Sequence, residues 1–392
     1  MKQNIVATLG AAIIFTSCQK TIDSPITKKN AEQVLNNKSS IDISSWKGVN
    51  LPVLSKSSTQ KNLSQSDFDY AASAGANIIR LSVHADPFDK RFLSFTNKDR
   101  AGIEINSNEG ISALKEAVAM AKKDNLKVII DMHSMPGRTN GEIWLNQFYW
   151  DELSNIWTAI TSVFKDDNTV IAFDLMNEPN VYTTVGSADI GRMFKGTWTP
   201  PARWTNTPRD YNLQIGKLIS AIRKIDNNRY VIVEGFGYLG NPVNYNWMKP
   251  IEGFDKVIYS FHMYEPTGLT MIGTKNFLYD NKVGVPFILS RDMEKIDNAL
   301  KPVIAFQKKY NVPVYVGEFG VTDDAIFKSD ANGVPYNGAA WLTTVINKMI
   351  ENKWGWTYWD FWTDIRKPDS NTDPRYVILR AAMTGQLIPI YK

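Results

Sequence analysis

Short apolar segments recur along the chain, and the intervals between them are long enough to hold helices. Most are near-continuous hydrophobic runs, as expected of strands that are covered on both faces. The eight segments are WKGVNLP (46–52), NIIRLSV (77–83), KVIIDMH (127–133), VIAFDLMN (170–177), YVIVEG (230–235), KVIYSFH (256–262), PVYVGEF (313–319) and GWTYWDF (355–361).

Several intervals have the periodicity of amphipathic helices. The apolar faces comprise Ile111, Leu114, Val118 and Ala121 in segment 110–125, and Ile215, Leu218, Ile222 and Ile225 in segment 211–228. Eight strands alternating with helices predict an α/β protein, a single (β/α)8 TIM barrel with long strand-end loops. A doubly wound open sheet is the alternative; it would need a glycine-rich phosphate turn after an early strand, and none follows the first strands.

Composition fits one soluble catalytic domain. The 392 residues are 43% hydrophobic and 21% charged, with a net charge of +4 and basic residues spread along the chain. Nothing in this pattern indicates a nucleic-acid partner. Length alone would suggest two or three domains, but no linker follows Trp46, and barrels with inserted loops reach this size. We therefore assign residues 46–392 to one (β/α)8 catalytic domain and expect a monomer.

The N-terminus has the layout of an export signal. Lys2 precedes an apolar stretch at 5–15 that is too short to span a membrane, and small residues lead to Cys18. FTSC resembles a bacterial lipobox, although Phe15 stands where Leu is usual. We predict a lipoprotein-type signal peptide at 1–17, a lipid anchor at Cys18 and a polar tether at 18–45. The protein would then be exported and anchored at the outer membrane or cell surface. The alternative is an ordinary signal peptide and a periplasmic or secreted protein.

Polar side chains gather at the C-terminal ends of the predicted strands, where barrels of this type carry their active sites. They are His133, Asn177, Glu178, His262, Tyr264, Glu318 and Trp359. Arg80 lies inside the second strand, where an unpaired cation would be costly, so we expect it to meet a carboxylate. Each residue alone has a structural explanation, but their convergence on one rim predicts an enzyme.

Two glutamates across a barrel mouth suit glycoside hydrolysis, in which one carboxyl protonates the leaving oxygen and the other acts at the anomeric carbon. Arg80 and Tyr264 would keep Glu318 ionised. Pro179 would hold Glu178 in extended backbone geometry, and poor solvation would help Glu178 keep its proton. Asn177 can bind a sugar hydroxyl, and Trp359 can stack on a sugar face.

Other chemistries fit less well. Asp131 and His133 could share a metal, but among the polar residues gathered at the strand ends only His262 is a further histidine, and the first strand carries no ligand. A serine hydrolase would show GxSxG, which is absent. We therefore predict no metal and no cofactor.

The sequence resembles glycoside hydrolase family 5, of the clan A barrels. The resemblance rests on WKGVNLP, IIRLSV, VIIDMHSMPG, FDLMNEP, SFHMY, VYVGEFG and GWTYWDFW, in this order over residues 46–362. It implies a retaining double displacement with Glu178 as acid/base and Glu318 as nucleophile, their carboxyls roughly 5 Å apart. Arg80 and Tyr264 would support Glu318, Asn177 would bind the sugar 2-hydroxyl, and His133 and His262 would shape the −1 subsite.

Substrate class follows less directly. We expect a β-linked glycan, first a β-glucan cut by an endo-β-1,4-glucanase, with β-mannanase and exo-β-glucosidase activity as alternatives. An inactive surface glycan-binding barrel is the alternative of another class, but such proteins usually lack one of the two glutamates. Several long loops carry aromatic residues that serve either as packing or as sugar platforms. These residues are Trp144, Tyr149, Trp150, Trp198, Trp204, Phe277, Tyr279 and Phe287.

Overall fold

A computed structural model of the chain describes residues 42–52, 63–85, 107–137, 141–181, 184–273, 284–360 and 372–391. The described residues all belong to one compact unit, the second of two along the chain, with bounds Ser40–Lys392. The predicted signal peptide, Cys18 and the tether up to residue 41 lie outside the described residues. Within the described ranges, no helix has the length and apolar character needed to cross a membrane.

The second unit contains a closed barrel of parallel strands in chain order, each bonded to its sequence neighbours and the last to the first. This closure confirms the (β/α)8 prediction and excludes the open sheet. The strands are β1 Lys47–Pro52, β2 Ile78–His84, β3 Lys127–Ser134, β4 Val170–Asp174, β5 Tyr230–Glu234, β6 Val257–Met263, β7 Val314–Phe319 and β8 Gly355–Tyr358.

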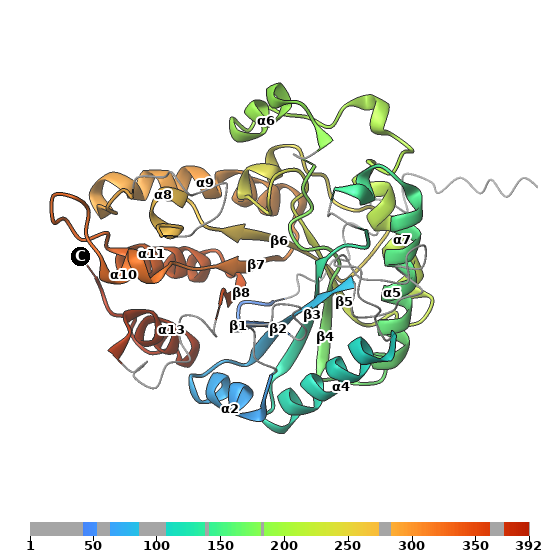
Figure 1. The fold of residues 1–392 in the computed structure, drawn as a ribbon, viewed down its shortest axis with the longest axis horizontal. Helices are drawn as coiled ribbons and strands as arrows, with labels where there is room; N and C mark the ends of the chain where they lie inside the picture. Colours follow the sequence, from blue (N-terminus) through green and yellow to red (C-terminus); the bar gives the residue numbers. More distant parts are fainter. Residues whose placement is uncertain are drawn as a thin grey trace, which may run out of the picture. The chain divides into compact units, whose positions relative to one another are not determined.

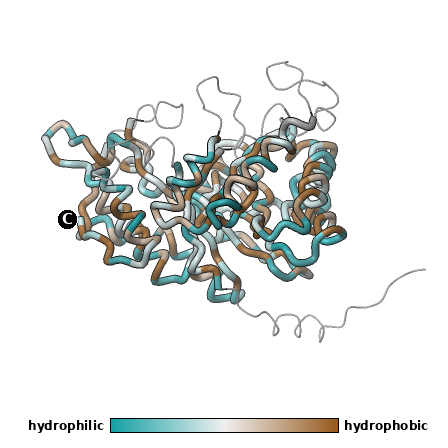
Figure 2. Tube along the Cα trace, turned by 90° about the horizontal axis from the view of Figure 1, so that it is seen from below, coloured by the Kyte–Doolittle hydropathy of each residue, from teal (hydrophilic) through white to brown (hydrophobic). Residues whose placement is uncertain are grey.

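Helices surround the barrel, and α5 and α7 lie side by side on its outside (Figure 1). Their bounds are α2 Gln65–Ser73, α4 Ser107–Lys123, α5 Gln147–Phe164, α6 Ser187–Phe194, α7 Tyr211–Arg223, α8 Thr267–Thr270, α9 Leu289–Tyr310, α10 Asp323–Phe327, α11 Gly338–Glu351 and α13 Pro374–Thr384. Hydrophobic and hydrophilic residues alternate along the helices (Figure 2). The predicted apolar faces of α4 and α7 pack on the core, except that Ile225 lies beyond the end of α7 at Arg223.

Short 3₁₀ helices lie in the strand-end loops. They are η1 Glu142–Trp144, η3 Ala202–Trp204 and η4 Pro242–Asn246. The helix η1 follows β3, η3 follows β4 and α6, and η4 follows β5. The long loops predicted after these strands therefore contain short helices.

Two layers of inward side chains fill the barrel, because alternate residues of each strand face its interior. The lower layer is an apolar cluster, buried apart from the main core, that includes Ile78, Ile129, Ala172, Ile232, Ile258 and Tyr315. Two positions further along five of these strands stand the buried polar residues Arg80, Asp131, Asp174, Glu234 and Ser260. The strands therefore seal the barrel below and present a charged layer toward their C-terminal ends.

Candidate active site

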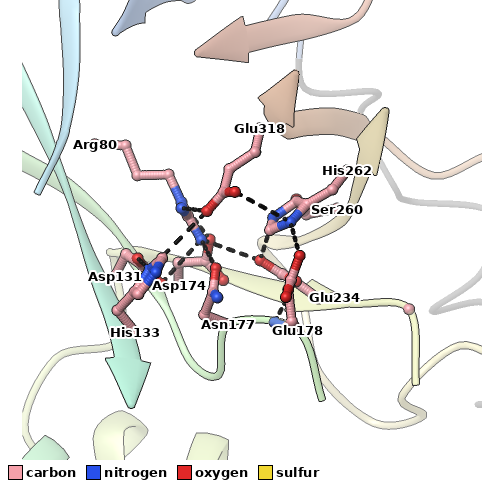
Figure 3. A network of polar contacts seen from close by, with 12 residues as sticks. Arg80, Asp131, His133, Asp174, Asn177, Glu178, Glu234, Ser260, His262 and Glu318 are labelled. Carbon is pink, nitrogen blue, oxygen red and sulfur yellow. Dashed lines mark hydrogen bonds and ion pairs between the residues drawn. The ribbon is translucent and has the colours of Figure 1, made fainter. Parts of the chain in front are cut away.

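Arg80 is the centre of the charged layer, and the described part of the chain places four carboxylates around it. Its Nε lies 2.9 Å from Asp174 Oδ2, and Nη1 lies 2.9 Å from Glu318 Oε1. Its Nη2 lies 2.9 Å from Asp131 Oδ1 and 3.1 Å from Glu234 Oε1. The predicted pairing of Arg80 with a carboxylate is confirmed, but its charge is divided among four partners (Figure 3).

Two asparagines complete the environment of the guanidinium. Nη1 of Arg80 also donates to Asn50 Oδ1 at 3.1 Å, and Nη2 donates to Asn177 Oδ1 at 2.9 Å. The Asn50 side-chain amide nitrogen donates to the backbone oxygen of Gly317 at 3.0 Å, which ties β1 to β7. Because the Asn177 oxygen is taken by Arg80, its amide orientation is fixed and its N–H groups are the donors left for other partners.

Both carboxylate oxygens of Glu318 are held. Arg80 binds Oε1, and the Tyr264 hydroxyl donates to Oε2 at 3.1 Å. His262 Nδ1 lies 3.5 Å from Oε2, and His133 Nδ1 lies 3.9 Å from Oε1. The expected contacts of Arg80 and Tyr264 with Glu318 are therefore present.

Glu178 follows β4, and its carboxyl points toward His262 (Figure 3). One of its carboxylate oxygens and one of Glu318 lie within 4.8 Å of each other. Its side chain is 28% exposed, against 6% for Glu318. The expectation of extended backbone before Pro179 is wrong, because Glu178 has φ +45° and lies in the left-handed region. Its backbone N–H donates to Glu234 Oε2 at 2.8 Å, a contact that fixes this conformation.

His262, on β6, bridges two of the carboxylates. Its Nδ1 lies 3.0 Å from Glu178 Oε1, and its Nε2 lies 3.0 Å from Glu234 Oε1. Glycines give the ring its space, since a Cβ on Gly317 would lie 3.1 Å from Nε2 and one on Gly240 would lie 3.0 Å from Cγ. Burial alone would lower the pKa of His262, but the charges of Glu234 and Glu318 and the hydrogen bonds raise it well above its usual value.

Proton affinities of the two glutamates run opposite to the prediction. Burial acts to raise the pKa of Glu178, but the hydrogen bond and charge of His262 outweigh it, and the pKa is lowered. Burial raises the pKa of Glu318, and the charges of His262 and Arg80 offset it only in part. The physical reason is that Arg80 serves four carboxylates, whereas His262 bonds Glu178 directly. These directions favour a protonated His262 beside an ionised Glu178.

His133 and Trp359 form the opposite wall of the site. The two rings stack with centroids 5.2 Å apart and an interplanar angle of 3°. His133 Nδ1 bonds Asp131 Oδ2 at 2.9 Å, so both residues point inward, as alternation along β3 predicted. Burial would lower the pKa of His133, but the hydrogen bond and charge of Asp131 raise it. The half-buried Trp359 is thus held by a fixed neighbour on one face.

Four residues at or near this site were missed as site residues in the sequence: Asn50, His84, Asp174 and Glu234. His84 also ends a strand, so all three histidines do; its Nδ1 bonds Ser134 Oγ at 3.0 Å, and its ring lies edge-on to His133. The other three are polar residues inside or ending apolar strands, in phase with the inward positions. That in-phase polarity was the signal available in the sequence.

One segment outside the early strands fits the glycine-rich pattern of a phosphate turn. GFGYLG at 235–240 fits GxGxxG, but it follows β5 rather than an early strand and leads to η4 instead of a long helix. Gly237 and Gly240 have positive φ, and the backbone nitrogen of Gly237 donates to Pro179 O at 2.9 Å. The string therefore serves the approach of the β5 loop to Glu178 and His262 rather than a phosphate turn.

Metal-ligand spacing occurs in the described residues at Glu178, His262 and Glu318, whose ligand atoms lie within 4.8 Å of one another. Both ring nitrogens of His262 already bond carboxylates. The Asp131–His133 pair considered as a metal site is occupied instead by mutual hydrogen bonding and by Arg80. These contacts favour a hydrogen-bonded network over a metal centre.

Four of the loop tryptophans are buried in aromatic packing. Trp144, Trp150, Trp198 and Trp204 are all at most 4% exposed; Trp150 packs on Trp144, and the other three pack against Phe236. Phe287 is buried and Tyr149 is half-buried, whereas Phe277 and Tyr279 lie outside the described residues. The buried loop aromatics therefore serve as packing rather than as sugar platforms.

A closed barrel that presents two facing carboxylates at the C-terminal ends of its strands, with an arginine and histidines around them, defines a glycoside hydrolase. The family model described as Cellulase (glycosyl hydrolase family 5) matches residues 34–365. The chain belongs to this family and is an O-glycosyl hydrolase.

Known relatives agree with this assignment. The chain is 24% identical over 319 residues to Endoglucanase C of Acetivibrio thermocellus, a match that covers 74% of this chain and 80% of the relative. The fold is similar to that of Thermotoga maritima Cel5A in complex with cellobiose, with a TM-score of 0.63, 19% identity and coverage of 86% of this chain and 96% of that one. The same protein in complex with mannotriose gives a TM-score of 0.63 at 18% identity, covering 87% and 98%.

Proposed function

We propose that the protein is a retaining endo-β-1,4-glucanase that hydrolyses β-glucan by double displacement. The observation that carries the mechanism is the approach of one Glu178 oxygen to one Glu318 oxygen within 4.8 Å. Retaining glycosidases hold their two carboxyls about 5–5.5 Å apart, whereas inverting ones leave about 6.5–9.5 Å for a water molecule. The short separation supports direct attack by one of the two carboxylates.

Glu318 is the proposed nucleophile. Arg80 and Tyr264 hold its two oxygens, so that either stays aimed while the other bonds the anomeric carbon. Burial raises the pKa of Glu318, and the positive charges of Arg80 and His262 act against burial. Positive charge that develops on the sugar in the transition state would further favour the ionised form of Glu318. Asn177, oriented by Arg80, would donate to the sugar 2-hydroxyl, and Trp359 would stack on the sugar.

Glu178 is the proposed acid/base. In the proposed mechanism His262 is protonated in the free enzyme, and its Nδ1 lies 3.0 Å from Glu178 Oε1. Substrate covers the 28% exposed Glu178 side chain, and loss of water favours the neutral carboxylic acid. The proton can then move to Glu178 and on to the leaving oxygen. In the second step Glu178 takes a proton from the water that releases the sugar from Glu318.

The mechanism is tested by trapping. An activated aryl 2-deoxy-2-fluoro-β-cellobioside should lose its phenolate and add the mass of one 2-fluorocellobiosyl disaccharide to the protein, and peptide mapping should place this label on Glu318. Glu318→Ala should take no label. Proton NMR of the first products should show the β anomer. Label on Glu318→Ala would refute the nucleophile, and α anomer as the first product would refute retention.

The substrate proposal rests on the relative named as an endoglucanase and on the cellobiose complex of the Thermotoga protein. Soluble β-glucans, β-mannans and cello-oligosaccharides should be compared in one hydrolysis panel, with viscosity recorded to separate internal from terminal cleavage. Rapid loss of viscosity on β-glucan is the expected result. Binding in affinity gels without any cleavage would instead favour a glycan-binding barrel.

A β-mannanase is the second candidate, because the Thermotoga structure with mannotriose pairs a similar fold with a mannan fragment. Faster cleavage of β-mannan than of β-glucan in the same panel would select it. The catalytic assignments would be unchanged, since both reactions use the same pair of carboxylates.

We also propose that the protein is an exported bacterial lipoprotein anchored at Cys18 and otherwise monomeric. The support is the sequence layout of residues 1–18. Metabolic labelling with an alkyne fatty acid should mark the wild type and not Cys18→Ser, and light scattering on protein lacking residues 1–18 should give one chain per particle. Equal labelling of both proteins would remove the anchor from the proposal.

Catalysis is expected to need no metal. The carboxyls, Arg80 and both imidazoles are paired with one another, so the charge that a metal would supply is already present as cations of the protein. Dialysis against EDTA should leave kcat/KM unchanged, because two carboxylates carry both steps of the proposed reaction. A loss restored by a divalent ion would contradict this, and metal analysis of the dialysed protein is the control.

A further inference from the structure

We propose that Glu234 is a positioning residue for the acid/base step, holding the Glu178 backbone and the His262 ring in one arrangement. This inference rests on the proposed role of Glu178 as the acid/base. It adds a third carboxylate, on β5, to the two that carry the chemistry.

The contacts of Glu234 are its first support. Glu234 is fully buried at the end of β5. Its Oε2 accepts from the Glu178 backbone N–H at 2.8 Å, and its Oε1 accepts from His262 Nε2 at 3.0 Å and from Arg80 Nη2 at 3.1 Å. The Tyr211 hydroxyl donates to its backbone oxygen at 2.9 Å, which fixes the strand end. One carboxylate therefore joins the backbone of Glu178 to the ring that bonds the Glu178 side chain.

The backbone of Glu178 needs such a partner. A non-glycine residue at φ +45° is in a sparsely populated conformation, and the following Pro179 restricts it further. Strained residues of this kind persist where their surroundings determine them, and a carboxylate accepting the backbone N–H is a strong constraint. The contact with Glu234 thus explains a conformation that Glu178 would not adopt alone.

The side chain of Glu178 depends on the same carboxylate through His262. Because Glu234 occupies Nε2, the imidazole presents Nδ1 to Glu178 Oε1. Among the described residues the charged groups facing His262 are Glu178 after β4, Glu234 on β5 and Glu318 on β7. A carboxylate behind an imidazole fixes its orientation and favours its protonated form.

Backbone pairing keeps the two loops in register. The backbone nitrogen of Gly237 donates to Pro179 O at 2.9 Å, and that of Val181 donates to Gly237 O at 3.1 Å. A Cβ on Gly240 would lie 3.3 Å from Glu234 Oε2 and 3.0 Å from His262 Cγ. Glycine at this position therefore leaves room for the carboxylate and the ring to meet.

A merely structural role predicts a different outcome. If Glu234 only balances the charge of Arg80, its loss disturbs Glu318 and slows every substrate alike. If it acts through Glu178, its loss matters most when the leaving group needs a proton. Aryl β-cellobiosides separate the two cases, because 2,4-dinitrophenolate leaves without protonation and phenolate does not.

The experiment measures kcat/KM on both aryl glycosides for wild type, Glu234→Gln, Glu178→Ala and Asp174→Asn. The amide introduced by Glu234→Gln would offer one oxygen in place of two, so at least one of the three donors loses its acceptor. Glu234→Gln should lose about 100-fold more on the phenyl than on the dinitrophenyl glycoside, the scale of general acid catalysis. Asp174→Asn is the matched control, a buried partner of Arg80 that bonds neither Glu178 nor His262 in the network described, and its losses should be equal on both substrates.

Each result decides between the alternatives. Equal losses in Glu234→Gln, with a selective loss in Glu178→Ala, would overturn the role of Glu234 and leave Glu178 as the acid/base. Equal losses in Glu178→Ala would overturn the acid/base assignment itself and the role of Glu234 with it. Circular dichroism checks folding, and Glu234→Asp carries the same comparison if Glu234→Gln does not fold.

NMR of His262 supplies a second measurement that is independent of turnover. The chain has three histidines, so each imidazole can be assigned by single substitution. Loss of the Glu234 charge should move the titration of His262 to lower pH, whereas Asp174→Asn should move it less. A His262 titration unchanged by Glu234→Gln would contradict the proposal.

Discussion

Asp131 and Asp174 sit opposite each other on neighbouring strands, and Arg80 bonds both. Burial acts to raise the pKa of Asp131, but Arg80 and the hydrogen bond from His133 lower it. Burial and the charges of Glu234 and Asp131 raise the pKa of Asp174 well above its usual value, against the pull of Arg80. The pKa values of two carboxyls in one layer thus shift in opposite directions, because Asp131 bonds His133 as well as pairing with Arg80.

This difference predicts unequal costs for the same substitution. Asp174→Asn replaces a carboxyl that favours its neutral form with another neutral group that still accepts from Arg80, so the free energy of unfolding at pH 7 should not fall by more than about 1 kcal/mol. Asp131→Asn removes an ionised partner from the buried Arg80 and a carboxylate that bonds His133, and should cost about 3 kcal/mol. Urea denaturation of both variants measures the two values, and equal losses would be evidence against the assignment.

At the scale of the structural elements, the tryptophans of the strand-end loops differ in burial and in position relative to the site. Trp198 is 1% exposed, donates from Nε1 to Asp189 Oδ1 at 3.2 Å and packs edge-on against Trp247. Trp359 is half-buried after β8 and stacks on His133. The first therefore supports the loop, whereas the second stands beside the catalytic carboxyls.

Alanine at each position should separate these roles. Trp198→Ala should lower the free energy of unfolding by about 3–5 kcal/mol, the usual cost of emptying a buried tryptophan site. In the fraction that remains folded, KM should be nearly unchanged. Trp359→Ala should cost little stability but reduce kcat/KM about tenfold, since an aromatic contact is worth up to about 1.5 kcal/mol. Denaturation and kinetics on one preparation test both, and the reverse pattern would exchange the two assignments.

Strands were the most predictable elements, because parallel strands buried on both faces are continuous apolar runs. Their predicted starts lie within one residue of the observed ones, but β4 ends at Asp174 rather than at residue 177. The positions of Arg80, Glu178 and Glu318 along their strands also predicted that these residues lie close together at the C-terminal end of the barrel. It could not show that Glu234 accepts from Glu178, since that contact depends on the left-handed backbone before Pro179. Alternation predicts which residues point inward but not which of them touch.

At the scale of the whole molecule, the barrel holds a charged layer directly above an apolar one. Carboxylates outnumber cations in this layer, so the folded protein holds protons there that the unfolded chain would release near neutral pH. Stability is therefore coupled to pH through a small set of buried groups rather than through the surface.

The sign of this coupling can be worked out group by group. The pKa of His262 is raised well above its usual value and that of His133 is raised, so their stabilisation is complete below about pH 6.5 and is lost as pH rises through their folded values. The raised pKa values of Asp174 and Glu318 act in the same direction, because their stabilisation is complete below about pH 4 and is lost as pH rises through their folded values. The pKa values of Asp131 and Glu178 are lowered, so their stabilisation is present above about pH 4 and is lost as pH falls through their folded values.

We therefore expect maximum stability on the acid side of neutrality, between about pH 4.5 and 6.5, and a melting temperature that falls steadily from about pH 6.5 to 9. Scanning calorimetry across this range measures it. His262→Gln should be less stable throughout, because the Glu178–His262–Glu234 bridge is lost, but its melting temperature should fall less steeply above pH 6.5, because the titrating imidazole is gone. Asp174→Asn should also flatten the slope while keeping the bridge. A wild-type melting temperature that rises over the alkaline range would show that the protons are not held where the hydrogen bonds place them.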